Sequence, residues 1–149
     1  MKLIGCWLNR TDQVITRYMN DMLQEFGLTR VAWQVLNVIH DTPDATDVNV
    51  LSTLSANADI HTLTAAIETL LADGWASRPA PDRLTLTCSG RQGLTEVAER
   101  VATFRDLSTS GISQDEYRTA VLVLERMTRN LETATGADLT EEDARGPGG

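Results

Sequence analysis

The chain of 149 residues has few cysteines, no long apolar run and a deficit of basic residues. Its two cysteines, Cys6 and Cys88, are too few for a disulfide framework and suit a reducing cytoplasm. No apolar run approaches the roughly 20 residues of a membrane span, and the N-terminus lacks the basic-then-apolar order of a signal peptide. We therefore expect a cytoplasmic protein without a membrane partner.

The motifs of common enzyme and metal sites are also absent. The sequence has no Cys-x-x-Cys, no His-Glu-x-x-His and no glycine-rich phosphate loop. Its two histidines, His40 and His61, fall on different predicted elements. A metal site at His40 with Asp41 and Asp44 is an alternative, but such aspartates are more often solvated loop residues. We expect no enzymatic activity, no metal and no cofactor.

The net charge of −8 argues against broad affinity for nucleic acids, because nonspecific binding depends on basic groups that displace counterions. Part of the acid lies in a C-terminal segment, which carries Asp138, Glu141, Glu142 and Asp143 against Arg145. This composition predicts a flexible, solvated tail over residues 137–149. The rest of the chain is still acidic.

What the sequence does have is helical periodicity with clear boundaries. Apolar residues at helical spacing predict a first helix over about residues 2–25, which Gly27 ends. Thr29 is placed to cap a second helix that closes at the loop of residues 41–44. Capping boxes at residues 89–92 and 113–116 open two more helices, which run to about Leu107 and Ala134.

Residues 47–91 carry the most specific pattern. Two short helices, at residues 47–56 with Asp47 as the cap and at residues 59–73, follow each other almost without a linker, and Gly74 stops the second. Strand-like runs at residues 75–78 and 84–87 then flank a turn at residues 79–82. This order predicts a winged helix-turn-helix, a mainly α fold with a small β-hairpin wing, whose second helix enters the DNA major groove.

The terminal helices predict an assembly. Residues 1–28 and 92–136 flank the winged domain of residues 29–91, which is too small to cover their apolar stripes. A second copy of the chain would cover them, so we expect a homodimer formed by the N- and C-terminal helices. The alternative is a monomer whose ends fold back on themselves.

Three segments, at residues 27–36, 67–75 and 86–91, resemble the MarR family of bacterial transcriptional regulators. The resemblance extends over nearly the whole chain. It implies a triangular homodimer that presents one winged domain to each half of a pseudo-palindromic operator in double-stranded DNA. It further implies a repressor more readily than an activator, released by a small ligand or by oxidation.

The resemblance also assigns DNA-binding positions, and this chain departs from the family at some of them. Family recognition helices usually have an arginine where this chain has Ala65, and residues 59–73 contain no lysine or arginine. Base contacts would then come from His61, Thr62 and Thr64. Around the wing, we expect Arg83 in the minor groove and Arg78 and Arg91 at phosphates.

Two alternatives concern this predicted interface. Arg78 and Arg83 would make surface ion pairs with Asp73 or Asp82 instead of contacting DNA. The acidic recognition helix, in turn, favours a winged-helix module that binds a protein and has lost strong DNA binding.

The resemblance further implies a ligand site in the crevice between the dimer helices and the winged domain. The residues facing it would be Trp7, Arg10, Thr11, Trp33, Asn37 and His40. Two tryptophans, an arginine and a histidine suit a small aromatic acid, which they would hold by stacking and a charge-assisted hydrogen bond. The alternative places both tryptophans in the core or the dimer interface.

Cys6 is a candidate redox sensor, because some family members sense hydroperoxides through a cysteine in the first helix. Lys2 and Arg10, each about one helical turn away, would favour the thiolate. The alternative is a simple buried thiol. Cys88, where a strand meets a helix, is expected to be structural. The sequence leaves the operator, the regulated genes and the effector open.

Overall fold

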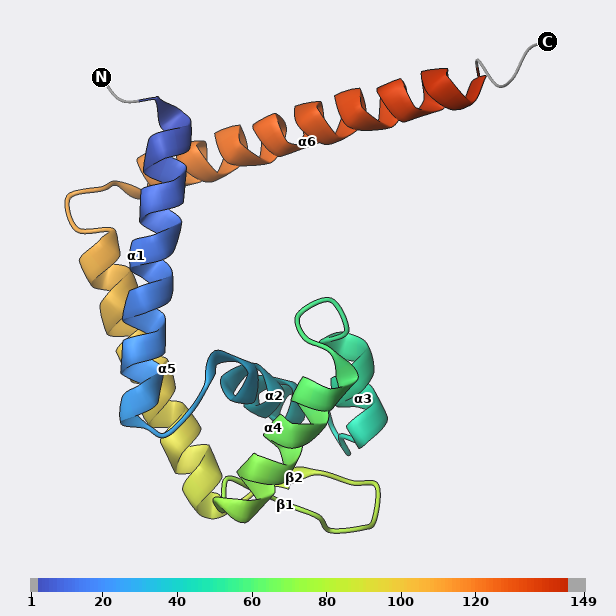
Figure 1. Cartoon of the computed structure of the whole chain (residues 1–149). Coiled ribbons are helices and arrows are strands. Elements are labelled where there is room, and N and C mark those ends of the chain that lie inside the picture. Colours follow the sequence, from blue (N-terminus) through green and yellow to red (C-terminus); the bar gives the residue numbers. More distant parts are fainter. Residues whose placement is uncertain (1–2, 145–149) are drawn as a thin grey trace. The chain divides into compact units, whose positions relative to one another are not determined.

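The computed structural model describes the backbone of residues 3–144 and the side chains of residues 3–135. Its elements in chain order are α1 (Ile4–Glu25), α2 (Arg30–Asp41), α3 (Asp47–Thr53), α4 (Ile60–Ala72), β1 (Ala76–Ser77), β2 (Thr85–Leu86), α5 (Cys88–Ser108) and α6 (Gln114–Ala144), as Figure 1 shows. The predicted mainly helical fold with a small hairpin is confirmed. The chain divides into two compact units, residues 1–104 and 105–149.

Helix boundaries in the first unit follow from local capping chemistry. Gly27 has φ +72° and Gly74 has φ +81°, which is the left-handed conformation that glycine adopts without strain, so α1 and α4 end where predicted. The hydroxyl of Thr29 accepts a hydrogen bond from the Ala32 N–H at 3.1 Å and caps α2, as predicted.

Two predicted caps are wrong by one or two residues. Thr46, not Asp47, caps α3, because its Oγ1 accepts from the Asn49 N–H at 3.1 Å while the Asn49 side chain accepts from the Thr46 N–H at 2.9 Å. Thr87, not Ser89, caps α5, with its Oγ1 accepting from the Gly90 N–H at 2.9 Å. In both cases a β-branched threonine ends an extended segment and starts the helix from there.

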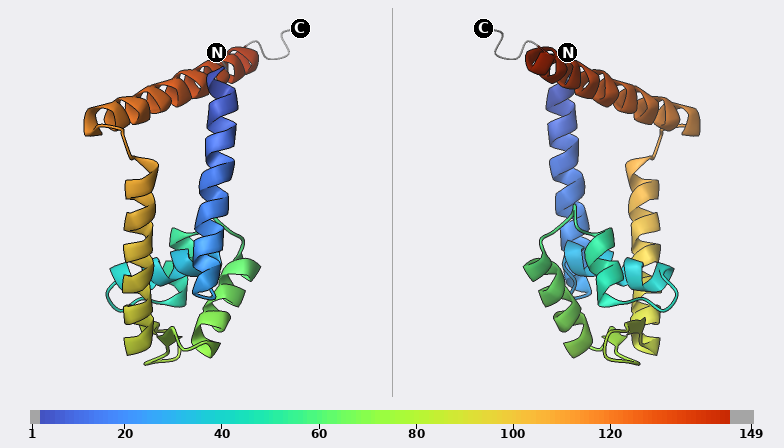
Figure 2. Two further views of the ribbon diagram at one scale, coloured as in Figure 1. Left: turned by 90° about the vertical axis from the view of Figure 1, so that its left-hand side faces the viewer. Right: turned by 90° about the vertical axis from the view of Figure 1, so that its right-hand side faces the viewer.

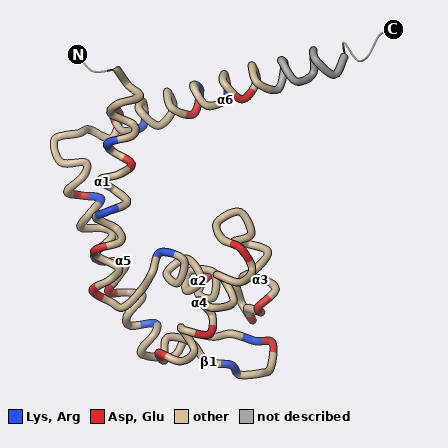
Figure 3. The backbone as a smooth tube through the Cα atoms, viewed as in Figure 1, with Lys and Arg blue, Asp and Glu red and all other residues tan. Residues whose placement is uncertain are grey.

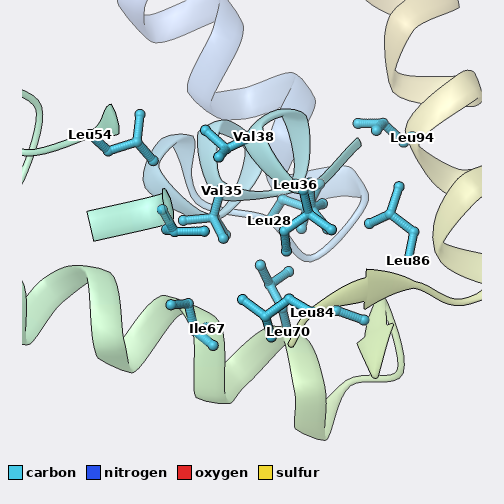
Figure 4. Close-up of a cluster of buried hydrophobic side chains, with 14 of the residues drawn as sticks. Leu28, Val35, Leu36, Val38, Leu54, Ile67, Leu70, Leu84, Leu86 and Leu94 are labelled. Atoms are coloured by element: carbon cyan, nitrogen blue, oxygen red, sulfur yellow. The ribbon is translucent and has the colours of Figure 1, made fainter. Parts of the chain in front are cut away.

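The core of the first unit lies around α2, which contacts α1, α3, α4 and β2. Figure 4 shows side chains of this core from α2, α4, β2 and α5 packed together between the helices. The largest fully buried side chains are Leu23, Leu36, Leu63, Leu70, Val35, Val50 and Val97. Because these residues come from α1 through α5, the helix-turn-helix is held rigidly on a single core.

The hairpin is short, with Ala76 paired to Leu86 and Ser77 to Thr85 in antiparallel register. Each strand has only two residues, whereas the sequence predicts four, because a third segment takes over the pairing. Thr46 forms a bridge with Arg83, and the Leu84 N–H donates to the Ala45 carbonyl at 2.8 Å. The segment before α3 therefore anchors the base of the wing.

α1 and α5 lie alongside each other next to the winged domain (Figures 1 and 2). The rings of Tyr18 and Phe104 stack with centroids 4.6 Å apart, and Arg100 forms an ion pair with Glu25 at 2.8 Å. Met19, Met22 and Leu23 bury the C-terminal half of α1 in the core, while its N-terminal half has exposed apolar residues.

α6 begins at the predicted capping box, in which the Ser113 N–H donates to Glu116 and the Glu116 N–H donates to the Ser113 hydroxyl, each at 3.1 Å. The helix runs to Ala144, past its predicted end near Ala134. The last residues of the predicted tail, 145–149, and Lys2 lie outside the described residues. Within residues 3–144, no helix is both long and apolar enough to cross a membrane.

Candidate nucleic-acid interface

α4 is the second helix of the helix-turn-helix and presents one polar face outward. Its buried positions, Leu63, Ile67 and Leu70, are 1–3% exposed and fix the helix on the core. The three predicted base-contacting residues, His61, Thr62 and Thr64, and Ala65, at the position of the usual family arginine, are all exposed. Since residues three and four apart share a helix face, the structure brings these positions together on the solvent side of α4.

The N-terminus of α4 is capped by Asp59, whose Oδ1 accepts from the Thr62 N–H at 2.7 Å. This backbone hydrogen bond lowers the pKa of the Asp59 carboxyl below its ordinary value. The carboxylate therefore stays ionised at the start of the helix, where the backbone N–H groups favour a negative charge. A phosphate at this helix end would meet the Asp59 charge.

The wing carries the basic residues that α4 lacks, and Figure 3 shows them beside acidic segments. Arg78 follows β1 and makes a bidentate pair with Asp47 of α3, with nitrogen–oxygen distances of 2.8 and 2.9 Å. Its Nη1 also donates to the Pro81 carbonyl at 3.2 Å. Both partners of the pair are about one third exposed, so water and salt reach it.

The ion pair shifts the pKa values of both Asp47 and Arg78. The pKa of Asp47 is lowered chiefly by the hydrogen bond from Arg78, against a smaller opposing effect of burial. The pKa of Arg78 is raised chiefly by the same hydrogen bond, and to a lesser extent by the charges of Asp47, Asp82 and Glu68. Arg78 thus points into an acidic neighbourhood formed by α3, α4 and the wing itself.

Arg83 and Arg91 complete the set of predicted backbone contacts. Arg83 precedes β2 and pairs with Asp44 at 3.0 Å, with the aspartate largely exposed. Arg91 is exposed in the first turn of α5 and forms no ion pair with any residue between 3 and 135. The expected alternative partners, Asp73 and Asp82, are not those that hold Arg78 and Arg83. Pairing with Asp47 and Asp44 escapes prediction because it joins segments that only the fold brings together.

The junction between the wing and α5 is tightly packed. A Cβ at Gly90 would lie 2.0 Å from the Trp75 carbonyl oxygen, and one at Gly93 would lie 2.5 Å from the Trp75 ring. Thr87 closes the same junction, donating from its hydroxyl to the Gly74 carbonyl at 2.6 Å. The two glycines of α5 therefore allow Trp75 to fix the position of the hairpin.

The candidate ligand residues form two groups. Trp7, Arg10 and Thr11 lie in the first turns of α1, where the Arg10 guanidinium is 5.8 Å from the centroid of the Trp7 ring. Along the helix axis, Trp7 lies about 18 Å and Thr11 about 12 Å from the buried Met19, at 1.5 Å per residue. The cation–π contact gives Arg10 a partner within α1 itself.

The second group lies on α2. Trp33 is partly buried and packs against the core, and the exposed His40 has its Nδ1 2.9 Å from Asp41. Asn37 lines a pocket of about 280 Å³ between α2 and the end of α3, together with Gln34, Val38, Asp41, Thr42, Thr53 and Leu54. A site shared by the two groups stays a prediction.

Cys6 and Cys88 are both free thiols, and both are exposed. Cys6 therefore differs from the simple buried thiol that was its alternative, and its redox role stays a prediction. No group of three or more histidine, cysteine or carboxylate side chains is arranged to hold a metal ion within the described part of the chain.

Solved structures of similar fold were found for most of the chain. A mutant of E. coli MarR in complex with operator DNA is 24% identical, with a TM-score of 0.66, and the alignment covers 83% of this chain and 92% of that one. The Mycobacterium tuberculosis MarR family protein Rv2887, in complex with DNA, is 19% identical with a TM-score of 0.67, covering 85% and 98%. MepR, a transcription regulator of a Staphylococcus aureus multidrug efflux pump, is 15% identical with a TM-score of 0.72, covering 87% and 99%.

The chain has the MarR fold. The coverage of each solved chain is nearly complete, so the likeness includes the terminal helices as well as the winged domain. No family model and no curated protein matches the sequence. In this fold α4 is the second helix of the helix-turn-helix and the β1–β2 hairpin is the wing, and their contact with DNA stays a prediction.

Proposed function

We propose that the chain is a DNA-binding transcriptional regulator that binds a pseudo-palindromic operator as a homodimer. The observation that carries the proposal is a complete winged helix-turn-helix in the MarR fold, with His61, Thr62 and Thr64 on the exposed face of α4 and Arg78 and Arg83 at the wing. Solved proteins of this fold include complexes with DNA.

Exposed apolar residues on the terminal helices support the homodimer. In α1, Ile4 and Trp7 are each 51% exposed and Val14 is 60% exposed. In α6, taken by itself, Tyr117 is 54% and Leu131 is 68% exposed. Apolar stripes of this length on two helices are covered in stable proteins, and a second copy of the chain is the partner always present.

In more detail, the proposal is that the dimer represses transcription and that a small aromatic acid releases it from DNA. A bound dimer represses transcription where its operator overlaps the promoter, because it excludes other proteins from the same DNA. The Trp7–Arg10 pair supports the ligand, since an indole beside a guanidinium offers both stacking and a charge partner for a carboxylate. Salicylate should quench tryptophan fluorescence and raise the melting temperature, and Arg10→Ala should abolish both effects.

A second candidate function is favoured by one observation. α4 has no lysine or arginine, and the wing arginines Arg78 and Arg83 are both engaged by aspartates. A winged domain of this charge also suits a basic protein partner. The two functions differ in the expected salt response on DNA, which makes DNA binding the deciding measurement.

The experiment titrates genomic fragments from upstream of the coding sequence with the dimer at several salt concentrations. Removal of one arginine–phosphate interaction should lower the log–log salt slope by about 0.9, so Arg83→Ala and Arg78→Ala should each flatten it. Because α4 has no basic residue, we expect Arg83→Ala to weaken binding more than His61→Ala or Thr64→Ala. Arg105→Ala, in the last turn of α5, is the matched control. Absence of binding by the wild type at low salt would leave the protein-partner function.

A further inference from the structure

The outward face of α4 includes residues beyond the predicted base contacts His61, Thr62 and Thr64. His61, Ala65, Glu68 and Ala72 follow each other at spacings of four, three and four residues, and all four are exposed. They form one stripe opposite the buried Leu63, Ile67 and Leu70. Glu68 is the only charged side chain in this stripe.

Glu68 projects beyond its neighbours. Ala65 and Ala72, about one turn before and after it, end at their Cβ atoms, so a groove that receives α4 meets the Glu68 carboxylate first. Within the described residues, that carboxylate accepts no hydrogen bond and forms no ion pair, and α4 offers no cation to neutralise it. Its charge reaches Arg78, which places Glu68 on the side of α4 towards the wing.

The chemistry of the major groove restricts what a carboxylate can do there. An ionised carboxylate only accepts hydrogen bonds, and phosphates repel it. Among the base edges, cytosine offers its N4 amino group and adenine its N6 amino group. In adenine the donor lies beside the N7 acceptor, which repels a carboxylate, whereas cytosine presents no such acceptor at the groove edge.

We infer that Glu68 determines sequence specificity by accepting a hydrogen bond from a cytosine amino group in each operator half-site. This inference rests on the proposed DNA-binding function. At a site without a donor, the carboxylate would be desolvated beside phosphates and left unpaired. Glu68 thereby acts mainly against wrong sequences, while the wing arginines supply sequence-independent affinity.

The test is selection of binding sites from a random double-stranded library by the dimeric protein, at low salt, with Glu68→Ala, Glu68→Gln and a control. The wild type should select a C·G pair at one position of each half-site. Glu68→Ala should reduce discrimination at that position by about tenfold to a hundredfold and bind sites without the cytosine more tightly than the wild type. Glu68→Gln should shift the preference towards adenine, which an amide contacts with two hydrogen bonds.

The matched control is Glu99→Gln, which makes the same change at an exposed position of α5, outside α4. It should retain the wild-type motif. If the wild type selects a motif that Glu68→Ala leaves unchanged at every position, the inference is overturned while the proposed function stands. If the wild type selects no sequence at all, both are overturned.

Discussion

Two regions of the first compact unit bury their apolar side chains to opposite extents. Around α2, the side chains of Val35, Leu36 and Val50 are fully enclosed by one chain at 0% exposure. In the N-terminal half of α1, Trp7 and Val14 are more than half exposed, although their sequence pattern is just as apolar. The winged domain therefore carries its own core, whereas the start of α1 leaves its apolar side chains exposed within the first unit.

The same contrast holds within α6, considered by itself. Its exposed apolar residues include Tyr117, Val121, Leu122, Val123, Leu124 and Leu131. No side chain of α6 between residues 114 and 135 is fully buried. A helix of this kind is stabilised by what it packs against more than by its own propensity. We therefore expect mutations in the two regions to be detected by different measurements.

The largest effect is expected in the core beneath α4. Leu63 is 1% exposed, so Leu63→Ala removes a fully packed side chain and should lower the free energy of unfolding by about 2–5 kcal/mol. Ile60 lies on the same helix at 67% exposure, and Ile60→Ala should change it by less than about 0.5 kcal/mol. Urea denaturation monitored by circular dichroism compares the two. Equal losses would contradict the burial of α4 described above.

The next effect tests the exposed region. Val14→Asp places a charge in the apolar stripe of α1, where it costs little in an isolated chain but is unpaired against an apolar partner. We expect the dimer dissociation constant to rise at least about a hundredfold, at 1.4 kcal/mol per factor of ten. Gln13→Asp, next to it and also exposed, is the control.

Light scattering or sedimentation at micromolar concentration measures this change. The wild type should have about twice the chain mass of 16.3 kDa, and Val14→Asp should approach the monomer. A wild type that remains monomeric would remove the dimer from the proposal.

A smaller effect on stability is expected from alanine substitutions at two glycines, Gly90 at the start of α5 and Gly5 in α1. A Cβ at Gly90 would lie 2.0 Å from the backbone oxygen of Trp75, so Gly90→Ala should displace the start of α5 and cost about 1–3 kcal/mol. Gly5, in α1, has nothing within 4 Å, and Gly5→Ala should stabilise the helix by up to about 1 kcal/mol. Thermal unfolding should move in opposite directions for the two variants. A shift in the same direction would indicate that the junction yields.

Much of this fold could be predicted from the sequence because its signals are local. Gly27, Gly74 and Thr29 mark helix ends through backbone conformation and capping, and the structure confirms all three. The exact caps of α3 and α5 could not be predicted, because neighbouring residues in each case have suitable side chains. At α3, the strand pairing of Thr46 with Arg83 makes Thr46, and not Asp47, the cap.

The candidate site could be predicted only in part. Helical spacing places His61, Thr62 and Thr64 on one exposed face, so their grouping follows from the sequence. The partners of Arg78 and Arg83 do not, because Asp47 and Arg78 lie 31 positions apart and meet through the fold of the wing base. Glu68 is not predicted from the sequence as a DNA contact, because that prediction looks for basic residues and a carboxylate only accepts hydrogen bonds.

The smallest effect on stability is expected for the Asp47–Arg78 ion pair. This pair bears on both candidate functions, because it decides whether the Arg78 charge is available to DNA. Because the pair is about one third exposed, Asp47→Asn should cost only about 0.2–1 kcal/mol at neutral pH. The folded-state pKa of Asp47 is lowered from 3.8, so its contribution is present above that value and is lost as the pH falls through the lower folded-state value. The stability difference between the wild type and the variant should therefore be complete at pH 5 to 7, shrink as the pH falls below about 4, and vanish below the folded-state pKa of Asp47.

The same variant should have a larger effect on DNA than on folding. With Asp47 neutral, Arg78 loses its bidentate partner and its charge becomes available to a phosphate, while one repulsive charge is removed from the interface. We expect Asp47→Asn to bind the operator more tightly and with a steeper salt slope than the wild type. Asp21→Asn, on α1 and without an ion pair among residues 3–135, should change neither quantity. Weaker binding by Asp47→Asn would mean that the pair holds Arg78 in its DNA-contacting position, so that the aspartate assists binding instead of competing with it.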